Sequence, residues 1–424
     1  MRLLLIPAVA GMVMLSAACA DRPDTAKTTA DSAGVRIVTN HSAVPPSGQE
    51  WPVSSEPIVE LGGGIEPEVP LLRVTGIAPL GDGRVVVGMN APPQVLVFEE
   101  NGSLVGSLGG EGDGPGEYAS VFSLADLPGD SIGVWDPYRR RLLVFTEDGR
   151  PEREIDFSSV VPIPLGAATN VGVESGFTWL LASAEGDLIL FPEGAVAGVT
   201  ERTVARPAMP ARWVDLNGAV LSTSPPIPGM EVLLGDPIGP IPVPFGARTY
   251  AVAVGKELIV GTAEAPELQV FGPEGTLTRI IRWPDQPRDI SGPFLATWSD
   301  LAEEWASEAG PLGAVLETLP KAERWPAYMD IIASDLGEVI VGRYPGPIGV
   351  WPMRRQDDSP DILRPTLRMP ERDWMVFDSN GALVAIFRTP EGFEPSMVRD
   401  SVIWGVFTDD LDIESVRAYH LTRR

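Results

Sequence analysis

The chain has 424 residues and a formal net charge of −26, because 58 Asp and Glu residues outnumber 32 Lys and Arg residues. Proteins that track nucleic-acid phosphates need a surface rich in Lys and Arg, and Lys occurs here only at positions 27, 256 and 321. The charge balance therefore argues against a nucleic-acid partner, while the 45 Gly and 43 Pro residues indicate many short elements joined by turns.

The amino-terminal residues have the pattern of an export signal that ends in a cysteine. A single Arg precedes an apolar stretch at residues 3–15, which is too short to span a bilayer. Small residues follow, and then Cys19, the only cysteine of the chain. Segment 15–19 resembles the lipobox of bacterial lipoproteins, although Ser16 stands three residues before the cysteine and Leu15 is displaced by one. We predict a signal peptide at residues 1–18 and acylation of Cys19.

Acylation would give a lipid-anchored protein of the cell envelope, either periplasmic or on the outer surface. The alternative is ordinary signal cleavage at Ala18-Cys19-Ala20, which would discard the cysteine and give a secreted protein. Loss of the signal leaves the mature chain more negative, so anionic lipid would repel the folded body and the acyl chain would be its attachment.

Residues 20–33 are polar and contain few large apolar side chains. Such a segment buries too little surface to become ordered, so we predict a tether. The first predicted strand is 35–39. Residues 19–56 are thus expected to comprise the lipid-attachment site, the tether and a lead-in strand.

An internal repeat with a period of 47 residues begins at residue 58. Leu61 matches Leu108 at this offset, and Val97-Phe98 matches Val144-Phe145. Two further copies of the Val-Phe pair, each followed by a glycine-containing turn and an alternating apolar run, begin at Val270 and Val376. Each copy is typical of a β-hairpin, in which the turn glycine adopts a positive φ.

A second pair of predicted strands precedes each hairpin. Four strands in a repeat of about 45 residues make a β-propeller blade. A weaker blade is expected to fill the gap between the second and fourth copies. The upstream pairs are 74–79 with 84–87, 122–125 with 132–135, 250–254 with 258–261, and 329–333 with 339–342; the weaker blade has strands at 177–183, 187–191, 202–205 and 212–216.

The last blade has too few strands of its own, with candidates only at 395–398, 402–407 and 414–421. Residues 58–61 align with an outer strand of the next repeat, so we expect them to complete this blade and close the ring, which hides two sheet edges. The prediction is an all-β fold, a six-bladed β-propeller over residues 57–424 with four-stranded antiparallel blades, terminal strand closure and a short helical insertion. A seventh blade is the alternative if the segment at residue 35 belongs to a blade of its own.

The second repeat also carries a family resemblance. Gly112 to Tyr118 reads Gly-Asp-Gly-Pro-Gly-Glu-Tyr, and Asp136, Arg141 and Phe145 follow it. This pattern resembles an NHL repeat, in which Arg139 replaces the usual Asn. Together with the lipobox-like signal, it makes the chain similar to bacterial six-bladed β-propeller lipoproteins with NHL-like repeats, a resemblance that implies a fold far more than a function.

Two insertions interrupt the repeats. Residues 224–244 are too rich in proline for a central strand, and form either an ordered loop packed on one face or a mobile excursion, with ligand contact as the alternative. Residues 291–322 change to helical periodicity, with Ser291 as a cap. The apolar stripe of this helix, which includes Phe294 and Trp298, is expected to pack against neighbouring blades, with a partner surface as the alternative.

The chain offers few residues for catalysis. His41 and His420 are the only histidines, both lie near the ring closure, and no nucleophile elbow, phosphate-binding loop or paired cysteine occurs. We therefore predict a monomeric binding or scaffold module without a catalytic residue or cofactor, whose partner is a protein or a carbohydrate at one propeller face.

The alternative is a lactonase-like hydrolase that depends on a divalent cation such as calcium in the propeller channel. The acidic loop 110–114 would hold a cation through its carboxylates, but it is equally well explained as a glycine-rich turn between blades.

Four residues are candidates for weak ligand contacts. Arg73, Tyr118, Arg248 and Tyr328 lie just before or at the start of predicted inner strands and are expected to ring the channel mouth. The competing interpretation gives them roles in turns and packing.

Overall fold

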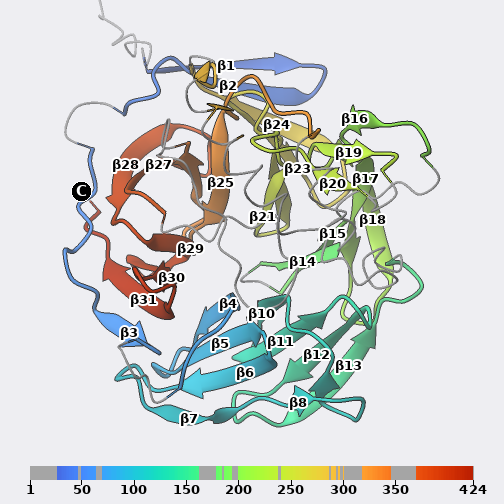
Figure 1. Cartoon of the computed structure of the whole chain (residues 1–424), viewed down its shortest axis with the longest axis vertical. Helices are drawn as coiled ribbons and strands as arrows, with labels where there is room; N and C mark the ends of the chain where they lie inside the picture. The colour runs from blue at the N-terminus through green and yellow to red at the C-terminus, as the bar shows by residue number, and fades with distance from the viewer. Residues whose placement is uncertain are drawn as a thin grey trace, which may run out of the picture.

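The computed structural model describes residues 26–45, 49–63, 69–161, 178–183, 186–192, 199–236, 240–285, 288–292, 295–296, 299, 318–344 and 369–423. Its main feature is a ring of six β-sheets, each with four antiparallel strands as its core, arranged like blades around an axis (Figure 1). The predicted all-β, six-bladed propeller is confirmed.

Blades 1 to 3 occupy the first half of the ring. Blade 1 comprises β4 (Val74–Pro79), β5 (Val85–Asn90), β6 (Pro93–Phe98) and β7 (Leu104–Ser107). Blade 2 comprises β10 (Ser123–Leu127), β11 (Ser131–Asp136), β12 (Arg141–Phe145) and β13 (Pro151–Asp156). Blade 3 comprises β14 (Thr178–Ala182), β15 (Leu188–Pro192), β17 (Ala208–Val214) and β18 (Val220–Pro228).

Blades 4 to 6 complete the ring. Blade 4 comprises β21 (Tyr250–Val254), β22 (Glu257–Gly261), β23 (Glu267–Phe271) and β24 (Leu277–Arg282). Blade 5 comprises β25 (Tyr328–Ala333), β26 (Val339–Arg343), β27 (Arg372–Phe377) and β28 (Leu383–Thr389). Blade 6 comprises β29 (Phe393–Arg399), β30 (Val402–Thr408), β31 (Glu414–His420) and β3 (Val59–Leu61).

The four Val-Phe hairpins occupy equivalent places in blades 1, 2, 4 and 5. In each, a register shift falls between the Val and the Phe of the third strand. The extra residue of this β-bulge sharpens the local twist in the same way each time. The four phenylalanines Phe98, Phe145, Phe271 and Phe377 are all buried, so the sequence repeat is also a structural repeat.

The amino-terminal side closes the ring as predicted. β3 pairs antiparallel with β31, with Val59 opposite Ala418 and Leu61 opposite Val416. Because blade 6 takes its outermost strand from the beginning of the propeller, both ends of the ring are held in one sheet.

Two corrections concern blade 3 and the proline-rich insertion. The segment at 202–205, expected to be the third strand, instead forms β16 (Thr203–Ala205) in a separate small sheet with β19 (Val232–Leu234) and β20 (Ile241–Pro242). The prolines at 225, 226 and 228 lie in β18, the outer strand of blade 3, where a missing backbone N–H is tolerated. The described residues of the insertion are therefore ordered and packed.

The tether prediction also needs correction. β1 (Lys27–Ser32) and β2 (Val35–Asn40) form a hairpin, and β2 adds in parallel to the outer strand of blade 4. The strand predicted at 35–39 is correct, but it extends an existing sheet and makes no seventh blade. β1 is polar and mostly exposed, so its order comes from backbone pairing with β2, which composition does not reveal.

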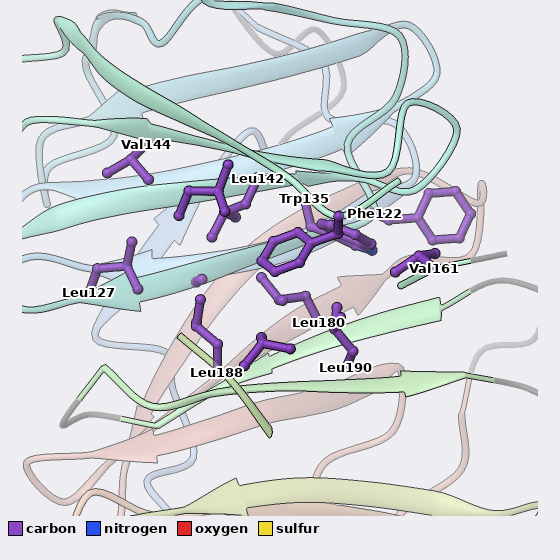
Figure 2. Close-up of a cluster of buried hydrophobic side chains, with 13 residues drawn as sticks. Phe122, Leu127, Trp135, Leu142, Val144, Val161, Leu180, Leu188 and Leu190 are labelled. Carbon is purple, nitrogen blue, oxygen red and sulfur yellow. The ribbon is translucent and has the colours of Figure 1, made fainter. Parts of the chain in front are cut away.

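The core consists of apolar layers between neighbouring blades. Figure 2 shows the layer between blades 2 and 3, where Trp135 of β11 and Leu188 and Leu190 of β15 are buried. The rings of Trp135 and Phe157 meet edge-to-face with centroids 5.8 Å apart. Each blade thus buries both faces of its sheet against its neighbours.

Most of the predicted helical insertion lies outside the described residues, including Phe294 and Trp298. Its described residues Leu295, Ala296 and Ser299 are helical, and the Leu295 amide donates a hydrogen bond to the Ser291 carbonyl. Among the described residues, no helix is long and apolar enough to cross a membrane.

Candidate functional site

The innermost strands of the six blades are β4, β10, β14, β21, β25 and β29, and Figure 1 shows them around the propeller axis. The strand register of blade 5 places Asp330 opposite Gly342, and Gly342 opposite Trp374, near the ends where β25 and β27 begin. The charges of Asp330, Arg372 and Arg248 all act on the hydroxyl of Tyr250, at the start of β21. We call Arg248, Tyr250, Asp330, Tyr344 and Arg372 the Arg372 cluster.

Arg372 is the most unusual residue of this cluster. It is 2% exposed, and its guanidinium nitrogens Nε, Nη1 and Nη2 make no hydrogen bond with the residues that the structure describes. The guanidinium lies over the Trp374 ring, 4.2 Å from its centroid, and the Asp330 carboxylate approaches only to 3.9 Å. A buried charge without hydrogen bonds is costly, so the fold holds Arg372 at an energetic disadvantage.

The pairing of blade 5 explains how Arg372 reaches Asp330. Gly342 on β26 stands opposite Asp330 on one side and Trp374 on the other. A Cβ at position 342 would lie about 3.0 Å from the Trp374 ring, so a larger residue there would press on this ring and displace it slightly. Arg372 is two residues before Trp374 and shares its face of the sheet.

Asp330 is accessible although it lies among buried groups. Its side chain is 23% exposed, and Oδ1 accepts a hydrogen bond from the Ile331 amide at 2.8 Å. Burial raises the pKa of Asp330 to about 6, the Arg372 charge opposes this rise, and the Glu394 charge adds to it. The carboxyl therefore ionises close to physiological pH.

Two tyrosines and a second arginine complete the cluster. Burial raises the pKa of both Tyr250 and Tyr344 above its ordinary value, and the positive charge of Arg248 opposes the rise at both hydroxyls. Within the described part of the chain, neither hydroxyl makes a hydrogen bond. Tyr250 is partly exposed and Arg248 is exposed. The Tyr344 backbone carbonyl accepts a 3.0 Å hydrogen bond from Arg288, and the Tyr344 ring packs on Trp325 with centroids 4.8 Å apart.

Of the four residues predicted to ring the channel mouth, Arg248 lies in the Arg372 cluster. Tyr328 lies beside it, with its ring centroid 6.3 Å from that of Tyr250. Tyr328 is 0% exposed, and its hydroxyl donates to the Glu267 carbonyl and accepts from the Ala263 amide, both at 3.0 Å. These bonds give Tyr328 a packing role.

Tyr118 and Arg73 lie far from the cluster in the ring order, on blades 1 and 2. Tyr118 is buried in the layer between these blades, where its hydroxyl donates to the Leu108 carbonyl at 3.0 Å and burial raises its pKa to about 12. Arg73 turns the chain into β4 with a φ of 51°, and its carbonyl accepts a hydrogen bond from the Asn90 amide. Cys19 lies outside the described residues.

Sequence reasoning missed Tyr250, Asp330, Tyr344 and Arg372 as site residues. Tyr250 and Asp330 lie inside predicted strands, and Arg372 lies just ahead of one, so all three were interpreted as scaffold. The available signal was polarity, because an Asp interrupts the apolar run of an inner strand at position 330.

The acidic loop proposed to hold a cation is instead tied to blade 2. Arg139 donates to the Gly112 carbonyl and pairs with Asp113, and the Glu117 carboxylate accepts the Gly114 amide at 2.6 Å. These contacts fit a turn between blades. Among the described residues, no group of three or more His, Cys, Asp and Glu side chains is placed to hold a metal ion.

Comparison with known proteins supports the fold. Residues 68–161 match the model of the DUF5128 family, described as a 6-bladed beta-propeller. No match was found among the curated proteins.

Solved structures with similar folds share little sequence with this chain. A duf4221 family member from Bacteroides vulgatus is 11% identical, with a TM-score of 0.52, covering 89% of this chain and 99% of that one. A Bacteroides fragilis protein described as exported is 13% identical, with a TM-score of 0.47 and coverages of 92% and 99%. Virginiamycin B lyase from Staphylococcus aureus is 11% identical, with a TM-score of 0.40 and coverages of 88% and 100%. The six sheets and the family match identify this chain as a six-bladed β-propeller.

Proposed function

We propose that this protein is an exported binding module of the cell envelope and that its ligand is held by the Arg372 cluster. The observation that carries the proposal is a buried guanidinium without a hydrogen bond, beside two tyrosine hydroxyls that also make none within the described residues. Buried polar groups in folded proteins are nearly always hydrogen-bonded. Several unpartnered groups at one place, together with a perturbed carboxyl, are typical of a binding site.

The ligand class that suits this site is a small polar molecule, or a polar group exposed on a carbohydrate or a protein. Tyr250 and Asp330 are partly exposed and Arg248 is exposed, so a ligand can reach their side chains. Arg372 contributes mainly charge, because its guanidinium is covered by its neighbours.

The proposed location rests on the amino-terminal sequence. We divide the chain into a signal peptide at residues 1–18, an acylation site at Cys19 and a propeller at residues 57–424. The hairpin of β1 and β2 shortens the proposed tether to residues 20–26, so the lipid anchor would hold the propeller close to the membrane surface.

Blade 2 is further proposed to be an NHL-like repeat, and its contacts support a role for the residues at that family's spacing. Asp136 accepts hydrogen bonds from the Ala119 amide and the Ser120 hydroxyl, both at 2.8 Å. Arg141 donates to the Glu117 carbonyl at 2.5 Å and to the Glu154 carboxylate at 2.8 Å. Asp136 and Arg141 thus connect the glycine-rich loop to the blade.

Binding is tested by thermal unfolding of the mature protein with a panel of sugars, sugar acids, amino acids and nucleotides. A ligand that binds only the native state raises Tm. The rise should be lost in the double variant Tyr250→Phe, Tyr344→Phe and kept in Tyr419→Phe, which alters a buried tyrosine of blade 6. A panel without any stabilising compound, or stabilisation that the double variant retains, would refute this site.

Anchoring is tested separately through Cys19→Ala. Wild-type protein should fractionate with membranes and the variant should be soluble. A mature protein that begins at Asp21 would exclude acylation.

A further inference from the structure

The Arg372 cluster contains two positively charged side chains, Arg248 and Arg372, and one carboxyl group, that of Asp330. Asp330 is the carboxylate nearest to Arg372, at 3.9 Å, and it can balance one guanidinium. Arg248 has no ion pair within the described part of the chain. Its positive charge therefore has no ion-pair partner there, beside two tyrosine hydroxyls that make no hydrogen bond with the described residues, in a chain whose net charge is −26.

We infer that the ligand of this site is an organic monoacid that also carries a hydroxyl or amino group. Its carboxylate is held by Arg248 with the hydroxyls of Tyr250 and Tyr344, and its hydroxyl or amino group donates to Oδ2 of Asp330. This inference rests on the proposed function and names the ligand class for the same site.

The hydrogen-bonding capacity of each side chain supports this assignment. An arginine guanidinium has only donors and matches the two oxygens of a carboxylate, with bonds stronger than those between neutral groups. A tyrosine hydroxyl can donate to the same carboxylate. An ionised aspartate only accepts, and Oδ2 of Asp330 makes no hydrogen bond with the described residues, so it can accept one from the ligand.

The surroundings favour one negative charge over two. A phosphate dianion would place its second charge near Asp330 and Glu394, whose charge already acts on Asp330. Like charges at such distances repel, and a partly buried site strengthens the repulsion. The Tyr250 ring offers an apolar surface for the carbon skeleton of the acid.

The test compares four probes by isothermal titration calorimetry on the mature protein at pH 7.5. D-Glucuronate has the carboxylate and hydroxyls, L-phenylalanine has the carboxylate and an amino group, D-glucose lacks the carboxylate, and cyclohexanecarboxylate lacks the second group. Glucuronate or phenylalanine should bind at least about tenfold more tightly than both partial probes, because a hydrogen bond to a charged group is worth a factor of that size. Preference between the two full probes distinguishes hydroxy acids from amino acids.

Two variants assign the contacts. Arg248→Gln should weaken binding of the preferred acid at least about tenfold, whereas Arg388→Gln, which changes a surface arginine of blade 5, should not. Asp330→Asn should weaken the same acid and leave cyclohexanecarboxylate unchanged. Asp373→Asn, a surface carboxylate paired with Arg388 at 2.7 Å, is its control.

The outcomes separate this inference from the proposed function. Glucose that binds as tightly as glucuronate, with loss in the double tyrosine variant, would leave the binding site standing and refute the acid. Binding of an acid that Arg248→Gln does not weaken would also refute it. If none of the four probes binds, the acid inference fails, while the wider panel above still decides whether the site binds a ligand.

Discussion

Blade 2 and blade 5 both place Arg and Asp side chains near the ends of their strands, but the two blades satisfy them differently. In blade 2, Asp136 accepts three hydrogen bonds, from the Ala119 amide, the Ser120 hydroxyl and the Arg139 amide. In blade 5, the Arg372 guanidinium is equally buried and makes no hydrogen bond with the described residues. A buried polar group with hydrogen bonds stabilises the scaffold, whereas a buried guanidinium without any costs stability.

The largest expected effect concerns Asp136, which is 0% exposed. Asp136→Ala leaves three donors without their acceptor, and we expect the free energy of unfolding to fall by about 3–5 kcal/mol. Urea unfolding measures the change. The control Glu152→Ala, on the exposed strand β13, should stay within about 0.5 kcal/mol. A loss below about 1 kcal/mol for Asp136→Ala would remove the contrast between the blades.

The next largest expected effect is a dependence of the free energy of unfolding on pH, caused by titration of Asp330. Because its pKa is raised from 3.8 to about 6 in the folded protein, the native state binds this proton more tightly than the unfolded state does. The stabilising contribution of the protonated form is present below about pH 4 and is lost as pH rises to about 6. Asp330→Asn lacks this loss, so its stability relative to wild type should increase by up to about 3 kcal/mol between pH 4 and 7.

Urea unfolding of both proteins at four pH values checks this difference. Subtracting the wild-type curve removes the contribution of the other carboxyl groups. A difference that does not change across this pH range would mean that the carboxyl titrates as it does in the unfolded chain.

Arg372→Met combined with Asp330→Asn should show the opposite sign to Asp136→Ala. Replacing both members of a buried ion pair with uncharged side chains of similar size is often stabilising, and we expect a gain of about 1–2 kcal/mol in the free energy of unfolding. Ligand binding to the cluster should weaken in the same protein. A loss of stability greater than about 2 kcal/mol would show that Arg372 serves the scaffold.

The smallest expected effects are the changes in stability when the hydroxyl of Tyr118 or of Tyr250 is removed. Tyr118→Phe removes a buried hydrogen bond to the Leu108 carbonyl and should cost about 1 kcal/mol. Tyr250→Phe removes a hydroxyl without a hydrogen bond among the described residues and should change stability by less than about 0.5 kcal/mol. Equal losses in the two variants, measured by chemical unfolding, would contradict the division between scaffold and site.

The sequence alone was sufficient to predict the strands of the blades that share the repeat. It was not sufficient to predict the strand pairing of the segments outside the repeat. The hairpins at Phe98, Phe145, Phe271 and Phe377 share a local signal, because alternation of side chains and a turn glycine encode a hairpin within a dozen residues. β16 was assigned to blade 3 because strand propensity does not name the partner strand. The pairing of β2 with β24 joins segments far apart in the chain and has no local signal.

The candidate site also shows that local sequence patterns locate strands but do not reveal which residues lie together. Arg248 was found because it precedes an inner strand, but Tyr118 and Tyr328 satisfied the same rule and proved to have bonded hydroxyls in the core. Position before a strand says where the chain is, and not whether a polar atom already has a partner.

By itself, the amino-acid sequence determined the repeated hairpins and the strand that closes the ring, since each depends on a short pattern or on a repeat. Only the tertiary structure decided that the Arg372 guanidinium lies buried beside Asp330 without a hydrogen bond to the described residues, because this depends on Gly342, on the Trp374 ring and on the register of three strands. Hydrogen-bond satisfaction is a property of groups brought together from different blades, and no single segment contains it.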